Sequence, residues 1–129
     1  MDNKILVDEA RKAMEFSYSP YSKFRVGAAL LSNDGKVYRG CNIENASFGG
    51  TNCAERTALF KAVSEGSKDF TKIAIISDSE DYISPCGICR QVLAEFGLDM
   101  EVIMAKNNGQ YKMMKIRELL PLAFTGEDL

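Results

Sequence analysis

The sequence contains no histidine among its 129 residues. A Ser-His-Asp triad or a Cys-His pair therefore cannot be assembled within this chain. A general base that works near neutral pH must then be a carboxylate with a shifted pKa, a lysine or cysteine with a lowered pKa, or a hydroxide held by a metal ion. The missing residue type directs attention to carboxylates, thiols and metals.

Positive charge and long apolar runs are also lacking. The net charge of -2 gives no basic surface for binding phosphates, so nucleic acid is not an expected partner. No apolar run approaches membrane-spanning length, and the opening Met1-Asp2-Asn3-Lys4 lacks the apolar core of a signal peptide. Four cysteines in such a chain favour metal binding or catalysis in a reducing compartment, so we expect a cytoplasmic protein with no membrane partner.

What is present is an ordinary globular composition, with 46% hydrophobic and 26% charged residues. At this length we expect one domain over residues 1–129. Apolar spacing and turn residues predict a helix from residue 6 to near 19, strands 24–31 and 36–43, a helix 53–65, a strand 73–76, a helix 86–96, strands 101–105 and 111–114, and a short helix 117–120. This order predicts an α/β fold, a three-layer α/β/α sandwich around a mixed five-stranded sheet.

Two short segments at predicted helix starts carry the chemistry. Cys53-Ala54-Glu55 follows Asn52, an expected N-cap, and Cys86 and Cys89 follow Pro85, which is expected at the first helical position. Unpaired N–H groups and a partial positive charge at a helix N-terminus favour thiolate over thiol. Because the last two cysteines are three residues apart, they share a helix face. Two such helix ends facing each other would form a thiolate site.

The three cysteines of these segments, Cys53, Cys86 and Cys89, are predicted to bind one Zn²⁺ ion per chain. Three protein ligands leave the fourth tetrahedral position to water, as in catalytic zinc sites, and this water would be the nucleophile. Glu55 can approach the open position without being a ligand and would move the protons. Three thiolates over-neutralise the dication, so Arg56 is a candidate to donate hydrogen bonds to the ligand sulfurs.

Each feature also has an ordinary interpretation. The closely spaced cysteine pair alone fits a redox dithiol or half of a structural zinc site. Cys41 could supply a fourth sulfur to a closed site, but its side chain should point away from that of Asn42 on a strand, so we expect a core residue. Glu55 could complete a capping box with Asn52. Arg56 could form a surface salt bridge.

Over nearly its whole length the sequence resembles the cytidine deaminase family, in particular its small homotetrameric bacterial members. The segments that carry the resemblance are Pro20-Tyr21-Ser22-Lys23-Phe24, Val26-Gly27-Ala28-Ala29, Gly40-Cys41-Asn42-Ile43-Glu44-Asn45-Ala46, Cys53-Ala54-Glu55-Arg56 and Ser84-Pro85-Cys86. The resemblance implies zinc-dependent hydrolytic deamination of cytidine and deoxycytidine to uridine and deoxyuridine, with Glu55 as the proton shuttle.

The resemblance also implies roles in substrate binding. Asn42 and Glu44 would bind the ribose hydroxyls, Phe24 would pack against the pyrimidine, and the Ala54 N–H and the Ser84 carbonyl would contact the base. Without the resemblance, a phenylalanine on a strand is more typical of a core residue, and Asn42 and Glu44 are typical of a solvated turn at the end of a strand. A carboxylate beside the sugar would repel a 5'-phosphate, which favours a nucleoside over a nucleotide.

A homotetramer with shared sites is a further implication, with Phe124 as the expected aromatic contribution to a neighbouring subunit. The sequence departs from the family pattern in two places. Phe48 stands where relatives often carry tyrosine, and Gly49-Gly50-Thr51 replaces a bulkier segment before the zinc helix. The alternatives are deamination of a related amine, such as a nucleoside antibiotic, a cytidylate or a guanine-type base, and a structural zinc-binding module.

Overall fold

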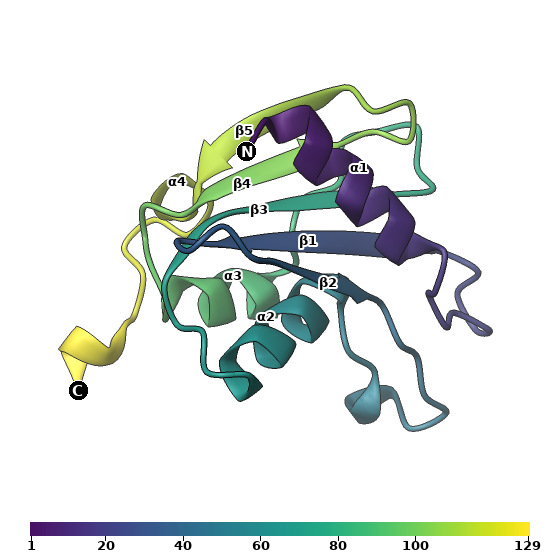
Figure 1. Cartoon of the computed structure of the whole chain (residues 1–129). Helices are drawn as coiled ribbons and strands as arrows, with labels where there is room; N and C mark the ends of the chain where they lie inside the picture. Colours follow the sequence, from purple (N-terminus) through teal and green to yellow (C-terminus); the bar gives the residue numbers. More distant parts are fainter.

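Five strands form one mixed sheet in the computed structural model, which describes residues 1–129 (Figure 1). The elements in chain order are α1 (Asn3–Met14), β1 (Val26–Ser32), β2 (Val37–Cys41), the 3-10 helix η1 (Phe48–Gly50), α2 (Ala54–Ser64), β3 (Phe70–Ser77), α3 (Gly87–Ala94), β4 (Glu101–Ala105), β5 (Tyr111–Lys115), α4 (Ile116–Leu119) and the 3-10 helix η2 (Gly126–Asp128). The predicted alternation of helices and strands is therefore confirmed.

The strand order is β2-β1-β3-β4-β5. β1 pairs antiparallel with β2 and with β3, β3 and β4 are parallel, and β5 returns antiparallel to β4. The β1–β2 hairpin turns at Gly35, whose φ of 91° lies in the left-handed region that glycine adopts without strain. A parallel pair needs a crossover connection, and α3 lies in the connection between β3 and β4.

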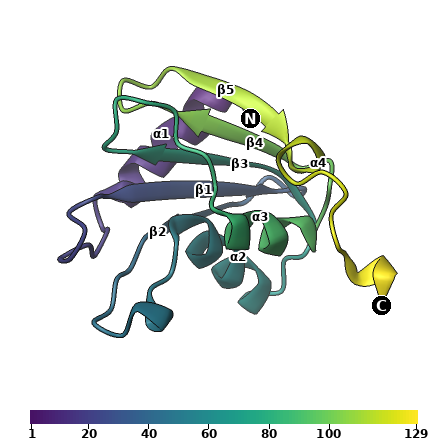
Figure 2. The same ribbon diagram turned by 180° about the vertical axis from the view of Figure 1, so that it is seen from behind.

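Helices cover both faces of the sheet. α1 lies across one face, and α2 and α3 lie on the opposite face (Figures 1 and 2). Along β1 the buried side chains alternate: Ala28 and Leu30 join the core under α2 and α3, whereas Ala29 and Leu31 join the core under α1. The predicted three-layer arrangement is thus confirmed. None of the helices is long and apolar enough to cross a membrane.

Two glycines allow helices to lie directly against the hairpin. A Cβ atom at Gly40 would lie 2.4 Å from the backbone nitrogen of Ala58 and 2.5 Å from the carbonyl oxygen of Ala54, both in α2. A Cβ atom at Gly27 would lie 2.1 Å from the carbonyl oxygen of Ala10 in α1. Because these distances are far below contact distance, only glycine fits. The first turn of α2 is consequently fixed against β2.

Differences from the predicted elements lie at their ends. α1 ends at Met14, several residues earlier than predicted, because the N–H groups of Phe16 and Ser17 bond to carbonyls three residues back and tighten the last turn. β3 spans Phe70–Ser77 rather than 73–76, since its pairing with β1 continues at both ends. The hairpin strands and α4 differ by one or two residues at their ends.

Two predicted helix starts are wrong. The N-cap of α2 is Cys53, and the side chain of Asn52 instead donates from Nδ2 to Oγ1 of Thr57 at 3.1 Å. The N-cap of α3 is Cys86, so Pro85 precedes the N-cap and lies two positions before the first helical residue, Gly87. Neither cysteine side chain forms a capping hydrogen bond. Both sulfurs are therefore available for other contacts at the helix ends.

Candidate metal centre and active-site cavity

Three thiol groups meet where α2 and α3 begin. Cys53 is the N-cap of α2, Cys86 is the N-cap of α3, and Cys89 lies in the first turn of α3. Their sulfur atoms all lie within 4.8 Å of one another, and Sγ of Cys53 is 3.8 Å from Sγ of Cys86. All are free cysteines rather than disulfides. The structure thus brings the three predicted ligands together.

The spacing of these sulfur atoms fits one tetrahedral zinc ion. Two sulfurs bound to zinc at about 2.3 Å in tetrahedral geometry lie about 3.8 Å apart. Thiolate ligands are also the soft donors that zinc accepts. Cys41 is not a member of the cluster and is buried in β2, as expected for a core residue. A closed site that uses Cys41 as a fourth ligand is therefore not formed.

Hydrogen bonds within the cluster favour a thiolate at Cys53. The pKa of Cys53 is lowered to about 5, chiefly because the Cys89 thiol donates to its sulfur, and Arg56 and Cys86 add to the effect. Donating this hydrogen bond, together with burial, raises the pKa of Cys89. Nη2 of Arg56 lies 3.4 Å from Sγ of Cys53. Negative charge is thereby concentrated at the N-terminus of α2, where the helix dipole stabilises it.

The carboxyl group of Glu55 is buried beside the thiols. Only 4% of this residue is exposed. Burial, aided by the negative charge of Cys53, raises the pKa of Glu55 to about 7. A carboxyl group that titrates near neutrality can both accept and release protons. The alternative of a capping box with Asn52 does not apply, because the N-cap of α2 is the following residue.

A cavity of about 250 Å³ opens beside the cluster. Its volume is slightly below the range of about 300–1,000 Å³ that is common for small-molecule sites. Most of the predicted site residues line it. The lining residues are Ser22, Phe24, Val26, Asn42, Glu44, Thr51, Asn52, Cys53, Ala54, Glu55, Ile83, Ser84 and Cys86.

Three predicted site residues do not line this cavity. Cys89 belongs to the sulfur cluster and Arg56 contacts the sulfur of Cys53, but neither residue lines the cavity. Phe124 is 59% exposed, in the C-terminal segment that extends away from the sheet after α4 (Figure 1). Phe124 therefore does not complete the cavity of its own chain.

Five lining residues had no role in the sequence-based site: Ser22, Val26, Thr51, Asn52 and Ile83. Val26 and Ile83 are apolar positions, and nothing in the local pattern distinguishes them from core residues. Ser22 and Val26 lie within segments that carried the resemblance, which is the one signal that could have found them. Thr51 belongs to the segment noted as a departure from the family pattern.

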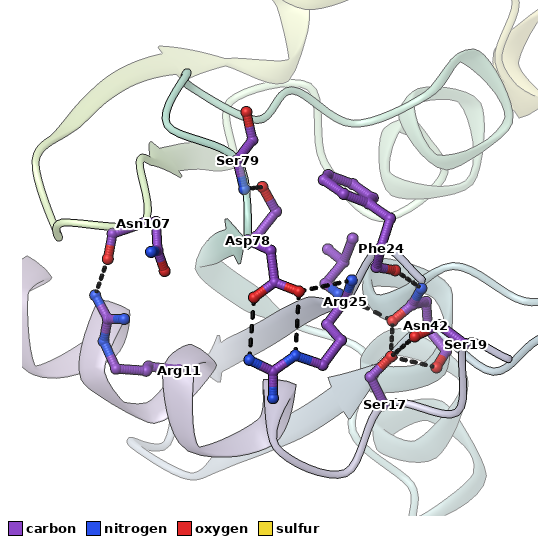
Figure 3. Close-up of polar contacts among 11 residues, drawn as sticks. Arg11, Ser17, Ser19, Phe24, Arg25, Asn42, Asp78, Ser79 and Asn107 are labelled. Atoms are coloured by element: carbon purple, nitrogen blue, oxygen red, sulfur yellow. Dashed lines mark hydrogen bonds and ion pairs between the residues drawn. The ribbon is translucent and has the colours of Figure 1, made fainter. Parts of the chain in front are cut away.

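Side-chain hydrogen bonds hold the cavity wall at the start of β1 (Figure 3). Oδ1 of Asn42 accepts from the backbone N–H of Val26 at 2.9 Å, and Nδ2 donates to the carbonyl of Phe24 at 2.8 Å. Arg25 pairs with Asp78 through two nitrogens, Nε and Nη2, each at 3.1 Å. The side chains of Asn42 and Asp78 thus hold residues 24–26, at the point where β1 begins.

A mixed sheet between helical layers, with three thiols at two helix N-termini and a buried carboxyl group beside them, defines a zinc-binding α/β enzyme. Residues 1–106 match the family described as the cytidine and deoxycytidylate deaminase zinc-binding region. The chain belongs to this family of hydrolytic deaminases, as its motifs predicted.

Comparisons with individual proteins agree with this family assignment. The chain is 54% identical to a cytidine deaminase of Halalkalibacterium halodurans, over 100% of this chain and 98% of that protein. It is 34% identical to a blasticidin-S deaminase of Bacillus cereus, over 93% and 90% of the two chains. The crystal structure of cytidine deaminase from Burkholderia pseudomallei matches with a TM-score of 0.93 and 47% identity, covering 96% of this chain and 100% of that chain.

Proposed function

We propose that this chain hydrolyses the exocyclic amine of cytidine and deoxycytidine, producing uridine or deoxyuridine and ammonia. One observation carries the proposal: the buried carboxyl group of Glu55, with its pKa raised to about 7, lines the same cavity as Cys53 and Cys86. The similarity of the whole chain to proteins named cytidine deaminase favours these substrates over other amines.

Cys53, Cys86 and Cys89 would hold the zinc ion, which when bound supplies a Lewis acid that makes water more acidic. Glu55 accepts a proton from the attacking water and passes it to the ring nitrogen beside the attacked carbon. It then carries the second proton of that water to the departing amine. Water and cytidine thus become uridine and ammonia, and Glu55 returns to its starting state.

The cavity residues would bind the nucleoside as the family resemblance implies. Phe24 packs against the pyrimidine, the Ala54 N–H and the Ser84 carbonyl contact the base, and Asn42 and Glu44 bind sugar hydroxyls. Their common position around one cavity supports these roles. A hydrogen bond from the Ser22 hydroxyl lowers the pKa of Glu44, so this carboxylate stays charged and disfavours a 5'-phosphate. A nucleoside therefore fits better than a cytidylate.

The assembly would be a homotetramer in the cytoplasm that serves pyrimidine salvage. Large apolar side chains near the C-terminus, Leu122 and Phe124, are exposed in the single chain, which favours contact with neighbouring subunits. Four free cysteines suit a reducing compartment. Phe124 would then contribute to the cavity of a neighbour.

The substrate is tested by measuring ammonia release from cytidine, deoxycytidine, their monophosphates, adenosine and blasticidin S in parallel. We expect the two nucleosides to have the highest kcat/KM. Metal analysis of protein purified without added zinc should give one zinc per chain. Faster release from a monophosphate or from blasticidin S would contradict the proposed substrate, and protein that binds no zinc would contradict the proposed site.

The proton carrier is tested with Glu55→Gln, which keeps the size of the side chain but cannot exchange protons. We expect kcat to fall by at least about 100-fold while zinc is retained. Cys41→Ala is the matched control, because Cys41 lies outside the thiol cluster and its loss should change neither zinc content nor turnover. Full activity of Glu55→Gln would show that another group moves the protons.

A further inference from the structure

Phe24, the residue proposed to pack against the pyrimidine, is held by hydrogen bonds on both sides of its backbone. Its N–H donates to Oγ of Ser22 at 3.0 Å, and its carbonyl accepts from Nδ2 of Asn42 at 2.8 Å (Figure 3 shows the second contact). Both partners line the cavity. The ring of Phe24 is therefore placed by side chains of the cavity rather than by a strand ladder.

Ser22 makes a second contact, to the proposed sugar-binding carboxylate. Its hydroxyl donates to Oε2 of Glu44. Oε1 of Glu44 accepts from the backbone N–H groups of Tyr21 at 2.9 Å and of Ser22 at 3.1 Å. Both carboxylate oxygens are thus fixed by the turn before Phe24. The hydroxyl group of Ser22 thus donates a hydrogen bond to Glu44 and accepts one from the N–H of Phe24.

The turn that presents Ser22 is itself specific. Lys23 adopts a φ of 62°, which is uncommon for a residue other than glycine, and its N–H donates to the carbonyl of Ser19 at 3.0 Å. Such a conformation persists where the surrounding contacts define it. Here the contacts on the turn are the Lys23–Ser19 hydrogen bond and the hydrogen bonds of Ser22 with Glu44 and Phe24.

We propose that Ser22 is a positioning residue for the substrate, linking the carboxylate that binds the sugar to the aromatic ring that packs on the base. The inference rests on the proposed function. Alanine at this position removes both contacts, whereas threonine retains a hydroxyl that can make both. Because Glu55 and the three cysteines do not contact Ser22, its loss should raise KM much more than it lowers kcat.

The sugar hydroxyl involved follows from the proposed substrates. Cytidine and deoxycytidine differ only at the 2' position, so a contact used by both falls on the 3'-hydroxyl or the 5'-hydroxyl. The 3'-hydroxyl and the 5' carbon are attached to neighbouring ring atoms, so a charged Glu44 bound to the 3'-hydroxyl would also repel a 5'-phosphate. The contact is therefore assigned to the 3'-hydroxyl, with 3'-deoxycytidine as the probe.

The experiment compares kcat/KM for cytidine and 3'-deoxycytidine in the unsubstituted chain, Ser22→Ala and Ser22→Thr. A hydrogen bond to a charged group implies that the unsubstituted chain discriminates against 3'-deoxycytidine by about 10-fold to 100-fold. If Ser22 positions Glu44, Ser22→Ala should lose most of this discrimination, while Ser22→Thr should keep it. A purely structural role of Ser22 would lower kcat/KM for cytidine and for 3'-deoxycytidine by the same factor, so the ratio of the two would be unchanged.

Ser64→Ala provides the matched control, since Ser64 lies at the end of α2, where its hydroxyl donates to the carbonyl of Lys61. An unchanged ratio in Ser22→Ala that has folded and bound zinc would overturn the positioning role. Equal turnover of the two nucleosides by the unsubstituted chain would overturn it together with the sugar contact of Glu44. Failure to turn over cytidine at all would instead contradict the proposed function.

Discussion

Arg56 donates from Nη2 to Sγ of Cys53 at 3.4 Å, and none of the ion pairs in the molecule includes this arginine. The surface salt bridge that its sequence position allowed is therefore absent. The guanidinium instead faces a sulfur whose pKa is lowered to about 5. A cation held against a thiolate in this way offsets part of the negative charge of a three-sulfur site.

Arg56→Gln should weaken zinc binding, because it leaves the charge of the sulfur cluster without its cationic partner. We expect zinc affinity to fall by about 10-fold to 100-fold, as for other groups that support metal ligands. Competition with a zinc chelator measures this. Arg117→Gln is the control, since its ion pair with Asp99 is exposed and should contribute little. Equal zinc affinity in both variants would refute a role of Arg56 at the metal site.

Gly40→Ala should damage the metal centre from a distance. Its Cβ would lie 2.4 Å from the nitrogen of Ala58 in α2, so the helix that begins at Cys53 must shift. Forcing extra atoms into a packed core costs about 1–3 kcal/mol of unfolding free energy, and this variant is expected at the upper end because the close atoms are backbone atoms of α2. Denaturant unfolding and zinc content measure both effects. Gly49→Ala is the control, because nothing lies within 4 Å of its Cβ position.

The acid dependence of ligand binding should report the contact between Ser22 and Glu44. The hydroxyl of Ser22 stabilises the carboxylate of Glu44 and lowers its pKa. Glu44 therefore stays charged at pH values at which an ordinary glutamate becomes protonated. In Ser22→Ala this stabilisation is lost, and Glu44 becomes protonated at a higher pH. The affinity for uridine should then decline at a higher pH than in the unsubstituted chain. Superimposable curves for the two proteins would contradict this, with Ser64→Ala as the reference variant.

The sequence predicted the chemistry of the site better than its local geometry. Cys53, Cys86, Cys89 and Glu55 could be selected because their types and spacing suit metal ligands and a proton carrier, and the structure brings them together. The N-cap of α2 was misplaced by one residue and the first residue of α3 by two, because propensity favours asparagine and proline over cysteine at helix starts. The first turn of α2 packs directly against Gly40, and this long-range contact cannot be predicted from the local sequence around Cys53.

Long-range side-chain contacts explain what the sequence left open. The hydroxyl of Ser22 bonds to Glu44, 22 residues away, and the amide of Asn42 bonds to Phe24, 18 residues away. These contacts depend on the hairpin bringing both segments to one edge of the cavity. A turn serine has an ordinary local role by default, so apart from the resemblance of its segment nothing in the sequence selected Ser22.

Phe124→Ala should impair a neighbouring subunit rather than its own chain, since Phe124 is 59% exposed and lies outside the cavity of its own chain. We expect this variant to retain zinc and Glu55 but to lose turnover. Co-expressing it with Glu55→Gln should restore activity above the sum of the two variants, because each defective chain supplies the group that the other lacks. The double variant carrying both substitutions, co-expressed with Phe124→Ala, is the control and should stay at background. If the first mixture shows only the sum of its components, Phe124 does not serve a neighbour.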